Sequence, residues 1–307
     1  MKIVFLDALT LGNVDFDRFK RFGEVDVYDI TSKDQTVERV KDADIVVTNK
    51  VVIDREVMDN SNIKFIQIAA TGMNNVDLEY AAKKGILVKN VAGYSTKSVV
   101  QHTFALVLGL LNKIRYFDEY SRSEYPKSPI FTHIQNWFEI SGKRWGIIGL
   151  GTIGKEVAKI ASAFGAEVVY YSTSGKNNDP DYKRIELDEL LVTSDIISIH
   201  APLNESTKNL LTKKELEKIK ENAVLVNLGR GGIINEKDLA EVLKTRNFYV
   251  GLDVFENEPI NADNELLGIK DKTLLTPHVA WTSIEARNKL MQGIYENIEE
   301  YVNKTAD

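Results

Sequence analysis

The stretch GLGTIG, residues 149–154, lies halfway along the chain, directly after the apolar run of residues 145–148. In a fingerprint of this form, Gly149 permits a tight turn, Gly151 lets the backbone approach a pyrophosphate, and Gly154 lets helix and strand pack closely. The helix that follows would turn its N-terminal amides toward the phosphates. The stretch therefore predicts a dinucleotide-binding fold with another domain in front of it.

The segments around the fingerprint have the order that such a turn requires. Residues 143–148 form a predicted buried strand, and residues 153–164 place apolar side chains at helical spacing. Gly165 closes this helix before a second predicted strand at residues 167–171. Glycines also mark ordinary turns, so the fingerprint alone is weak evidence, and it is this strand, turn, helix and strand order that indicates cofactor binding.

Composition excludes several classes of function. The chain has 307 residues, 43% of them hydrophobic, which is enough to fill two domain cores. The formal net charge of -6 disfavours a nucleic-acid or anionic-membrane surface and leaves a small molecule as the expected partner. There is no cysteine and no metal-ligand spacing, so we expect no metal and no thiol chemistry. Residues 1–7 are too short for a secretion signal or a membrane span, and we expect a cytoplasmic protein.

Strand-like runs on both sides of the fingerprint predict two parallel α/β domains. The runs before it alternate with helix-compatible segments, and those after it continue the same alternation. The first group is 2–6, 25–28, 43–48, 64–69 and 86–88, and the second is 195–199, 223–228, 249–254 and 273–275. Together with the two strands at the fingerprint, the second group predicts a six-stranded doubly wound sheet.

Two long helical segments connect these domains. Residues 98–121 are mostly apolar and are expected to form one helix leading out of the first domain, and residues 283–303 are amphipathic and are expected to return to it. We therefore predict a substrate domain of residues 1–97 plus 283–307 and a cofactor domain of residues 98–282. A cleft between two such domains is the expected site for cofactor and substrate.

The chain has only four histidines, which limits the choice of an acid or base. His102 lies in an apolar helix and is expected to pack or to form a hydrogen bond, His133 lies in a loop and is expected to be solvated, and His200 ends a strand. His278, in TPHVAW, lies just past the carboxyl end of a strand, where open α/β sheets bind ligands. His278 is therefore the predicted acid.

Two further strand ends carry charged side chains. Arg230, in NLGRGG, and Glu258, in GLDVFENEP, each follow a predicted strand. A histidine that acts near neutral pH needs a partner to fix its tautomer, and a carboxylate is the usual one. From spacing alone the alternative stays open that Arg230 and Glu258 form a structural ion pair while His278 caps a loop.

The order Arg230, Glu258, His278 downstream of a mid-chain GxGxxG resembles the D-isomer-specific 2-hydroxyacid dehydrogenase family. The resemblance covers nearly the whole chain. It implies a Rossmann dinucleotide-binding domain inserted in a flavodoxin-like substrate domain. Its motifs are AATGMNNVD (69–77), GYSTKSVVQHTFAL (93–106), GLGTIG (149–154), HAPLNESTKNL (200–210), NLGRGGIINEKDL (227–239), GLDVFENEP (251–259) and TPHVAW (276–281).

The resemblance also implies roles for single residues. In that family the residue matching His278 donates a proton to the substrate carbonyl while nicotinamide delivers hydride. The residue matching Glu258 hydrogen-bonds the imidazole, and the one matching Arg230 holds the carboxylate and polarises the keto oxygen. Backbone amides around Thr71 and Gly72 would complete the carboxylate site. The positions that match cofactor contacts are Thr71, Gly149, Gly151, Thr152, Ile153, Gly154, Ala201, Pro202, Leu228, Gly229 and Asp253.

Several features narrow the expectation within the family. Glu258 disfavours the formate dehydrogenase branch, which carries glutamine there, and the chain length disfavours the long phosphoglycerate dehydrogenases. TNKVVID (48–54), GYST and TPHVAW look most like glycerate dehydrogenases, also called hydroxypyruvate reductases. We therefore predict hydroxypyruvate or glyoxylate as substrate, with Trp281 among its contacts. A homodimer is expected by analogy, with residues 116–140 as its arm and Trp137 reaching the partner.

Two alternatives of function stay open. One is a D-lactate-like dehydrogenase that acts on longer 2-keto acids. The other is a non-catalytic NAD(H)-sensing binding protein on the same scaffold.

The adenosine end departs from the family pattern, because Ser172 stands where an acidic residue would accept the ribose hydroxyls. A carboxylate there favours NAD and repels the 2′-phosphate of NADP, so its absence removes a barrier to NADP. The arginine that usually holds this phosphate is absent from residues 171–176. The hydroxyls of Ser172, Thr173 and Ser174 and the ammonium of Lys176 could substitute. Either NAD(H) or NADP(H) is therefore the predicted cofactor, and dual or NADP-leaning use is our hypothesis.

Overall fold

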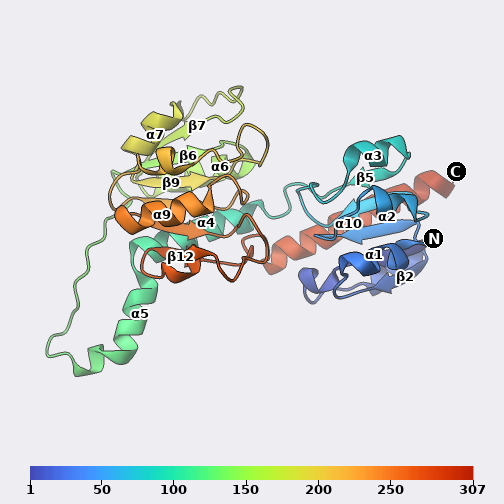
Figure 1. Cartoon of the computed structure of the whole chain (residues 1–307), viewed down its shortest axis with the longest axis horizontal. Coiled ribbons are helices and arrows are strands. Elements are labelled where there is room, and N and C mark those ends of the chain that lie inside the picture. Colours follow the sequence, from blue (N-terminus) through green and yellow to red (C-terminus); the bar gives the residue numbers. More distant parts are fainter. Residues whose placement is uncertain (307) are drawn as a thin grey trace. The chain divides into compact units, whose positions relative to one another are not determined.

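The computed structural model describes residues 1–306, which divide into two compact units (Figure 1). Unit 1 contains Met1–Ser95 and the segment that starts at Thr282, and unit 2 contains Thr96–Trp281. The ends of unit 2 lie two residues and one residue from the boundaries expected for the inserted domain. Each unit is built on its own parallel sheet with helices on both faces.

The sheet of unit 1 has five parallel strands in the order β2-β1-β3-β4-β5. This is the flavodoxin-like order. Its register places Ile3 opposite Val25 on one side and Ile45 on the other. The strands are β1 (Lys2–Phe5), β2 (Glu24–Val27), β3 (Ile45–Thr48), β4 (Phe65–Ile68) and β5 (Leu87–Lys89).

Alternating side chains of these strands build a core on each face of the sheet. On one face, residues such as Val46 and Ile66 form a core with α1, α2 and α3. On the other face, Phe65 packs on Tyr301 of α10, with ring centroids 5.0 Å apart. The helices are η1 (Ala8–Leu11), η2 (Asp17–Phe22), α1 (Lys33–Val40), α2 (Arg55–Asp59), α3 (Leu78–Lys83) and α10 (Ile284–Ala306).

The sheet of unit 2 has seven parallel strands in the order β12-β11-β10-β9-β6-β7-β8. The prediction of six strands was one short, because the Lys-Arg pair of β8 has no apolar pattern. The order reverses between β6 and β9, which is where a doubly wound sheet binds its ligand. The strands are β6 (Arg144–Ile148), β7 (Glu167–Tyr171), β8 (Lys183–Arg184), β9 (Ile196–Ile199), β10 (Val224–Asn227), β11 (Tyr249–Leu252) and β12 (Thr273–Leu275).

Helices cover both faces of this sheet. On one face Trp145 and Val226 pack under α4 and α6, and on the other Leu225 and Val250 pack under α7, α8 and α9. The helices are α4 (Thr96–Leu111), α5 (Ile114–Ser123), η3 (Tyr125–Lys127), α6 (Thr152–Ala163), α7 (Leu187–Thr193), α8 (Lys213–Leu216), α9 (Glu236–Thr245) and η4 (Glu265–Gly268).

The single helix expected at residues 98–121 is wrong, because the chain breaks between α4 and α5. Lys113 adopts a φ of 51°, which ends the helical path without a glycine or a proline. Beyond the break, α5 has no buried residue, and Figure 1 shows it extending away from the sheet of unit 2. Among the described helices, none combines the length and the apolar character that a bilayer crossing needs.

Candidate active site

The turn after β6 has the backbone that a dinucleotide site needs. Gly149 has a φ of 93°, which side chains of L residues rarely allow. A Cβ atom on Gly154 would lie 2.3 Å from the carbonyl oxygen of Gly149, so only a glycine lets α6 approach the turn this closely. A Cβ on Gly151 would meet no atom within 4 Å, so the turn is open on that side. The uncapped amides at the start of α6 suit an anion there.

A pocket of about 580 Å³ opens beside this turn. Its walls come from the segments after β6, β7 and β9, which meet at the point where the strand order reverses. A dinucleotide cofactor fits this place, because the open turn lines the cavity together with side chains that carry hydroxyl and amide groups. The lining residues are Gly149, Leu150, Gly151, Ser172, Thr173, Ser174, Asn177, His200, Pro202, Asn204, Glu205 and Ser206.

Several residues that line the pocket were not predicted from the sequence as cofactor contacts. Asn177 joins two walls, since its backbone N–H donates to Ser172 Oγ at 3.2 Å and its side-chain amide donates to the Leu150 carbonyl at 2.5 Å. Glu205 adds a carboxylate from the segment after β9. The signal for these residues was their place just past a strand end at the reversal of the sheet.

An arginine does stand next to the loop after β7. Arg184 of β8 donates from Nη1 to the Gly175 carbonyl at 2.8 Å. Arg184 lies beyond residues 171–176, the segment where such an arginine is expected, so the local sequence did not predict it. The segment that contains Ser172 thus has a guanidinium beside it.

The remaining predicted cofactor positions in unit 2 do not line this pocket. Thr152, Ile153 and Gly154 begin α6. The segments of Ala201 and Gly229 cross closely, since a Cβ on Gly229 would lie 2.7 Å from the Ala201 carbonyl oxygen. Leu228 is buried next to Gly229 in sequence, and Ala201, Leu228 and Gly229 belong to the segments that follow β9 and β10.

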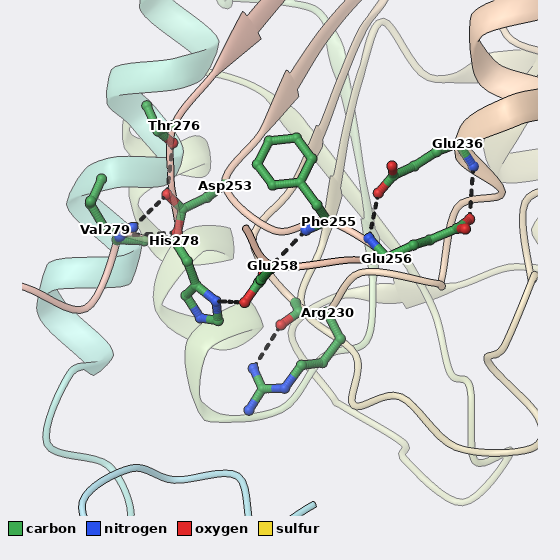
Figure 2. A network of polar contacts seen from close by, with 11 residues as sticks. Arg230, Glu236, Asp253, Phe255, Glu256, Glu258, Thr276, His278 and Val279 are labelled. Carbon is green, nitrogen blue, oxygen red and sulfur yellow. Dashed lines mark hydrogen bonds and ion pairs between the residues drawn. The ribbon is translucent and has the colours of Figure 1, made fainter. Parts of the chain in front are cut away.

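His278 and Glu258 form the imidazole and carboxylate pair of the site. His278 Nδ1 and Glu258 Oε2 are 2.7 Å apart, and Figure 2 shows the two side chains facing each other. Both are partly open to solvent, with 24% and 26% of the side chain exposed. The φ of His278 is 55°, an uncommon conformation for a residue other than glycine. Because Nδ1 faces the carboxylate, Nε2 is the nitrogen that can serve a substrate.

Arg230 lies at the same edge of the sheet. Its Nη1 donates to the Gly229 carbonyl at 2.8 Å. Figure 2 shows the Arg230 guanidinium and the His278 ring both pointing away from the strands of the sheet. A Cβ on Gly231 would lie 1.8 Å from the Phe255 carbonyl oxygen. Only glycine therefore lets the segment with Arg230 lie against the segment that leads to the carboxylate of the pair.

Asp253 holds the loop that carries His278. This carboxylate is 1% exposed and accepts the Thr276 hydroxyl at 2.7 Å and the backbone N–H groups of Val279 and Ala280 at 2.9 Å each. Asp253 was predicted as a cofactor contact, and the structure shows both of its oxygens bonded to this loop.

The other histidines lie in different surroundings. Both ring nitrogens of His200 are buried without a hydrogen-bond partner among the described residues, and this burial lowers the pKa of His200 to about 3. His102 Nε2 is 3.1 Å from Thr276 Oγ1. His133, which was expected to be solvated, is partly exposed, and its Nε2 is 2.8 Å from the Tyr116 hydroxyl while its ring stacks on Tyr120.

The three other predicted substrate contacts are Thr71, Gly72 and Trp281. Thr71 and Gly72 belong to unit 1, in the segment after β4, where the Thr71 carbonyl accepts the Asn90 amide at 2.6 Å. Trp281 is partly buried and ends unit 2. Their roles stay predictions.

The fold and these residues define a class of protein: a dinucleotide-binding α/β protein with an imidazole–carboxylate pair and a guanidinium at one sheet edge. Such a set can move a proton on an anionic substrate.

The chain belongs to the D-isomer specific 2-hydroxyacid dehydrogenase family, whose NAD binding domain matches residues 104–280. It is an oxidoreductase that uses a nicotinamide cofactor, and the predicted family and fold class are confirmed.

Relatives extend over nearly the whole chain. A hydroxypyruvate reductase of Blautia hydrogenotrophica is 38% identical, covering 98% of this chain and 97% of the relative. A glycerate dehydrogenase of Methylorubrum extorquens is 34% identical, covering 98% and 96%. Among solved structures, an acyclic imino acid reductase in complex with NADPH and D-Arg has a TM-score of 0.89 at 32% identity, covering 99% of this chain and 98% of that one.

Proposed function

We propose that the protein reduces hydroxypyruvate or glyoxylate to D-glycerate or glycolate with a nicotinamide cofactor. The observation that carries the proposal is the 2.7 Å contact between His278 Nδ1 and Glu258 Oε2 at the sheet edge that also presents Arg230. The similarity to a hydroxypyruvate reductase and a glycerate dehydrogenase supports the substrate class.

In the proposed reaction His278 acts as the proton donor. The nicotinamide, when bound, supplies the hydride that goes to C2 of the keto acid. His278 gives its Nε2 proton to the keto oxygen, which becomes the hydroxyl of the product. Glu258 keeps Nδ1 protonated and stabilises the imidazolium before the transfer. In the direction of oxidation the neutral imidazole takes this proton back.

Arg230 is the proposed substrate anchor. A 2-keto acid carries its carboxylate and keto oxygen in one plane, and a guanidinium can donate to both. We assign the backbone amides of Thr71 and Gly72 and the side chain of Trp281 to the same substrate. A short substrate with a hydroxyl at C3 agrees with the names of the relatives.

For the cofactor we propose that both NADH and NADPH are accepted. Residues 172–177 contain hydroxyls and Lys176 but no carboxylate, and Arg184 adds a second cation. Glu205, which lines the pocket from the segment after β9, disfavours NADPH, since a carboxylate suits ribose hydroxyls and repels a phosphate. The ratio of the two catalytic efficiencies tests the proposal, and a strong preference for NADH would reject it.

A homodimer is the proposed assembly. The segment after α5 exposes large apolar side chains, with Phe131 at 89%, Ile134 at 80% and Trp137 at 51%. Apolar surface of this kind is typical of a protein interface. Light scattering after size exclusion should give twice the chain mass, and Phe131→Ser should lower it toward one chain. The cytoplasmic location stays a prediction.

The test of function is the loss of absorbance of NADH and of NADPH, measured separately with hydroxypyruvate, glyoxylate, pyruvate and 2-ketoisocaproate. Fastest oxidation with hydroxypyruvate or glyoxylate supports the proposal. Preference for 2-ketoisocaproate would favour the D-lactate-like alternative, and cofactor binding without turnover would favour a sensor. Pyruvate with an added amine supplies an imine, which tests the activity named for the structural relative.

A further inference from the structure

Two mirrored hydrogen bonds join Glu256 to the first residue of α9. The Glu256 backbone N–H donates to Glu236 Oε1 at 2.5 Å, and the Glu236 backbone N–H donates to Glu256 Oε1 at 3.0 Å (Figure 2). Each carboxylate thus holds the backbone of the other residue. We call this pair of hydrogen bonds the Glu236–Glu256 clamp.

The clamp closes the loop of residues 256–264, which carries Glu258. At the far end of this loop, Asn264 Nδ2 donates to Glu236 Oε2 at 2.6 Å. Asn264 Oδ1 also accepts the Leu266 backbone N–H at 3.0 Å, which fixes the amide at the start of η4. Glu236 therefore uses one oxygen for each end of the loop.

The direction of the Glu258 side chain depends on this loop. Glu258 Oε1 accepts the Phe255 backbone N–H at 3.2 Å, while Oε2 faces His278. Glu256 lies between the donor of that first bond and Glu258 in sequence. A shift of the Glu256 backbone would therefore turn the carboxylate away from the imidazole.

The clamp also links two of the three strand-end segments at this edge. Glu236 begins α9 directly after the segment that carries Arg230, and Gly231 of that segment lies against Phe255. The same two segments are thus joined at Gly231 by close backbone packing and at Glu236 by hydrogen bonds. The distance between the guanidinium and the carboxylate of the pair depends on both contacts.

The buried position of the Glu236 carboxylate is energetically costly unless hydrogen-bond donors surround it. Glu236 is 8% exposed, and burial raises the pKa of its carboxyl group. The hydrogen bonds from Glu256 and Asn264 oppose this rise, and the negative charges of Glu256 and Glu258 add to it. Burial of a charge is costly unless donors surround it, and here the donors come from the loop that bears Glu258.

We propose that Glu236 is a positioning residue for the reaction: through the Glu236–Glu256 clamp it holds the Glu258 carboxylate against His278 Nδ1. This inference rests on the proposed function, in which His278 is the proton donor. Glu236 acts through Glu258 and not on the substrate.

The first test compares Glu236→Ala, Glu236→Gln and the control Glu241→Ala, which removes an exposed carboxylate from the same helix. Glu236→Ala should lower kcat for hydroxypyruvate on the order of tenfold or more, because small displacements in a site cost this much. The cofactor Kd should stay unchanged. Glu236→Gln keeps an acceptor for the Glu256 N–H but presents an amide to Asn264, so its loss should be smaller. Glu241→Ala should behave as the wild type.

The pH profile separates positioning from a general loss of stability. A carboxylate held beside an imidazole favours its charged form. Without the clamp, the alkaline limb of the reduction profile should therefore move to lower pH, as it should in Glu258→Gln. In the Glu258→Gln background, Glu236→Ala should add less than about twofold, because both act through one contact. A limb that stays in place, or losses that multiply, would overturn the positioning role.

Amide hydrogen exchange tests the clamp without turnover. Residues 255–264 should exchange faster in Glu236→Ala than in Glu241→Ala, and equal rates would refute the clamp whatever the activity. If the wild type turned over none of the acceptors, the proposed function would fail and the positioning role with it. Normal wild-type turnover with an unmoved alkaline limb would remove only the positioning role.

Discussion

His200 and His278 both follow parallel strands of the sheet in unit 2, yet their surroundings differ. The ring nitrogens of His200 are buried and have no hydrogen-bond partner among the described residues, which lowers its pKa to about 3. His278 lies 2.7 Å from the Glu258 carboxylate and is partly open to solvent. The first ring stays neutral at every ordinary pH, and the second can carry a proton to a substrate.

A place at a strand end therefore does not make a histidine an acid. The partner and the access to solvent decide it. At β12, Asp253 holds the loop, Glu258 faces the ring, and Glu236 holds the segment that bears Glu258. At β9 the His200 imidazole lines the pocket beside β6, and no carboxylate among the described residues is bonded to it.

The largest expected effect comes from His278→Ala. Loss of the proton donor should lower kcat for keto acid reduction about 1,000-fold or more, since general acid catalysis contributes on this scale. Fluorescence titration should give a cofactor Kd within about twofold of the wild type, because the pocket lies beside β6 and β9. The matched control is His133→Ala, which removes a histidine from the segment after α5. Turnover near the wild-type level in His278→Ala would refute the assignment of the acid.

Glu258→Gln should have the next largest effect. Glutamine keeps the size of the side chain but removes the charge, so kcat should fall on the order of 100-fold. The alkaline limb of the reduction profile should move to lower pH, because the charged imidazole loses its partner. Glu241→Gln, at an exposed carboxylate of α9, is the control for charge alone. An unmoved limb in Glu258→Gln would mean that the carboxylate does not support the proton donor.

His200 should change the pH dependence of stability and not the pH profile of catalysis. Its folded pKa of about 3 lies below the ordinary 6.5, so the unfolded chain binds the extra proton between these values and acid favours unfolding. At pH 5 this costs at most about 2 kcal/mol, since part of the residue is exposed. Urea unfolding at pH 7.5 and pH 5 should show a smaller acid loss in His200→Gln than in the wild type. Equal losses would contradict a buried neutral ring.

The smallest expected effect is on cofactor choice at the His200 side of the sheet. Arg184→Ala should lower kcat/KM for NADPH roughly threefold to tenfold and leave the value for NADH unchanged, because only NADPH carries the additional phosphate. Lys183→Ala, the neighbouring exposed cation on β8, is the control. An equal loss with both cofactors would show that Arg184 supports the loop and does not select the phosphate.

Much of the fold follows from local sequence signals. The bounds of β7 and β12 were predicted to the residue, because each is a short apolar run with polar neighbours. The break after α4 could not be predicted, because Lys113 gives no local sign of a positive φ. β8 was missed because its two charged residues pair only where β7 supplies the backbone.

In the site, too, some residues could be predicted from local sequence and others could not. Arg230, Glu258 and His278 could be found because parallel strands bring their carboxyl ends to one edge. The contact of Arg184 with Gly175 and the Glu236–Glu256 clamp could not, because each joins residues from separate segments. Burial of the His200 nitrogens depends on the packing around β9, which no short motif describes.

Hydride transfer to C2 with proton transfer from His278 is tested most directly by analysis of the product formed from hydroxypyruvate with reduced cofactor that carries deuterium at both hydrogen positions of the nicotinamide C4. The proposed reaction gives D-glycerate with deuterium at C2 from the wild type and from Glu241→Ala, and almost none from His278→Ala at equal cofactor occupancy. L-glycerate, a product without deuterium at C2, or an equal yield from His278→Ala would contradict it.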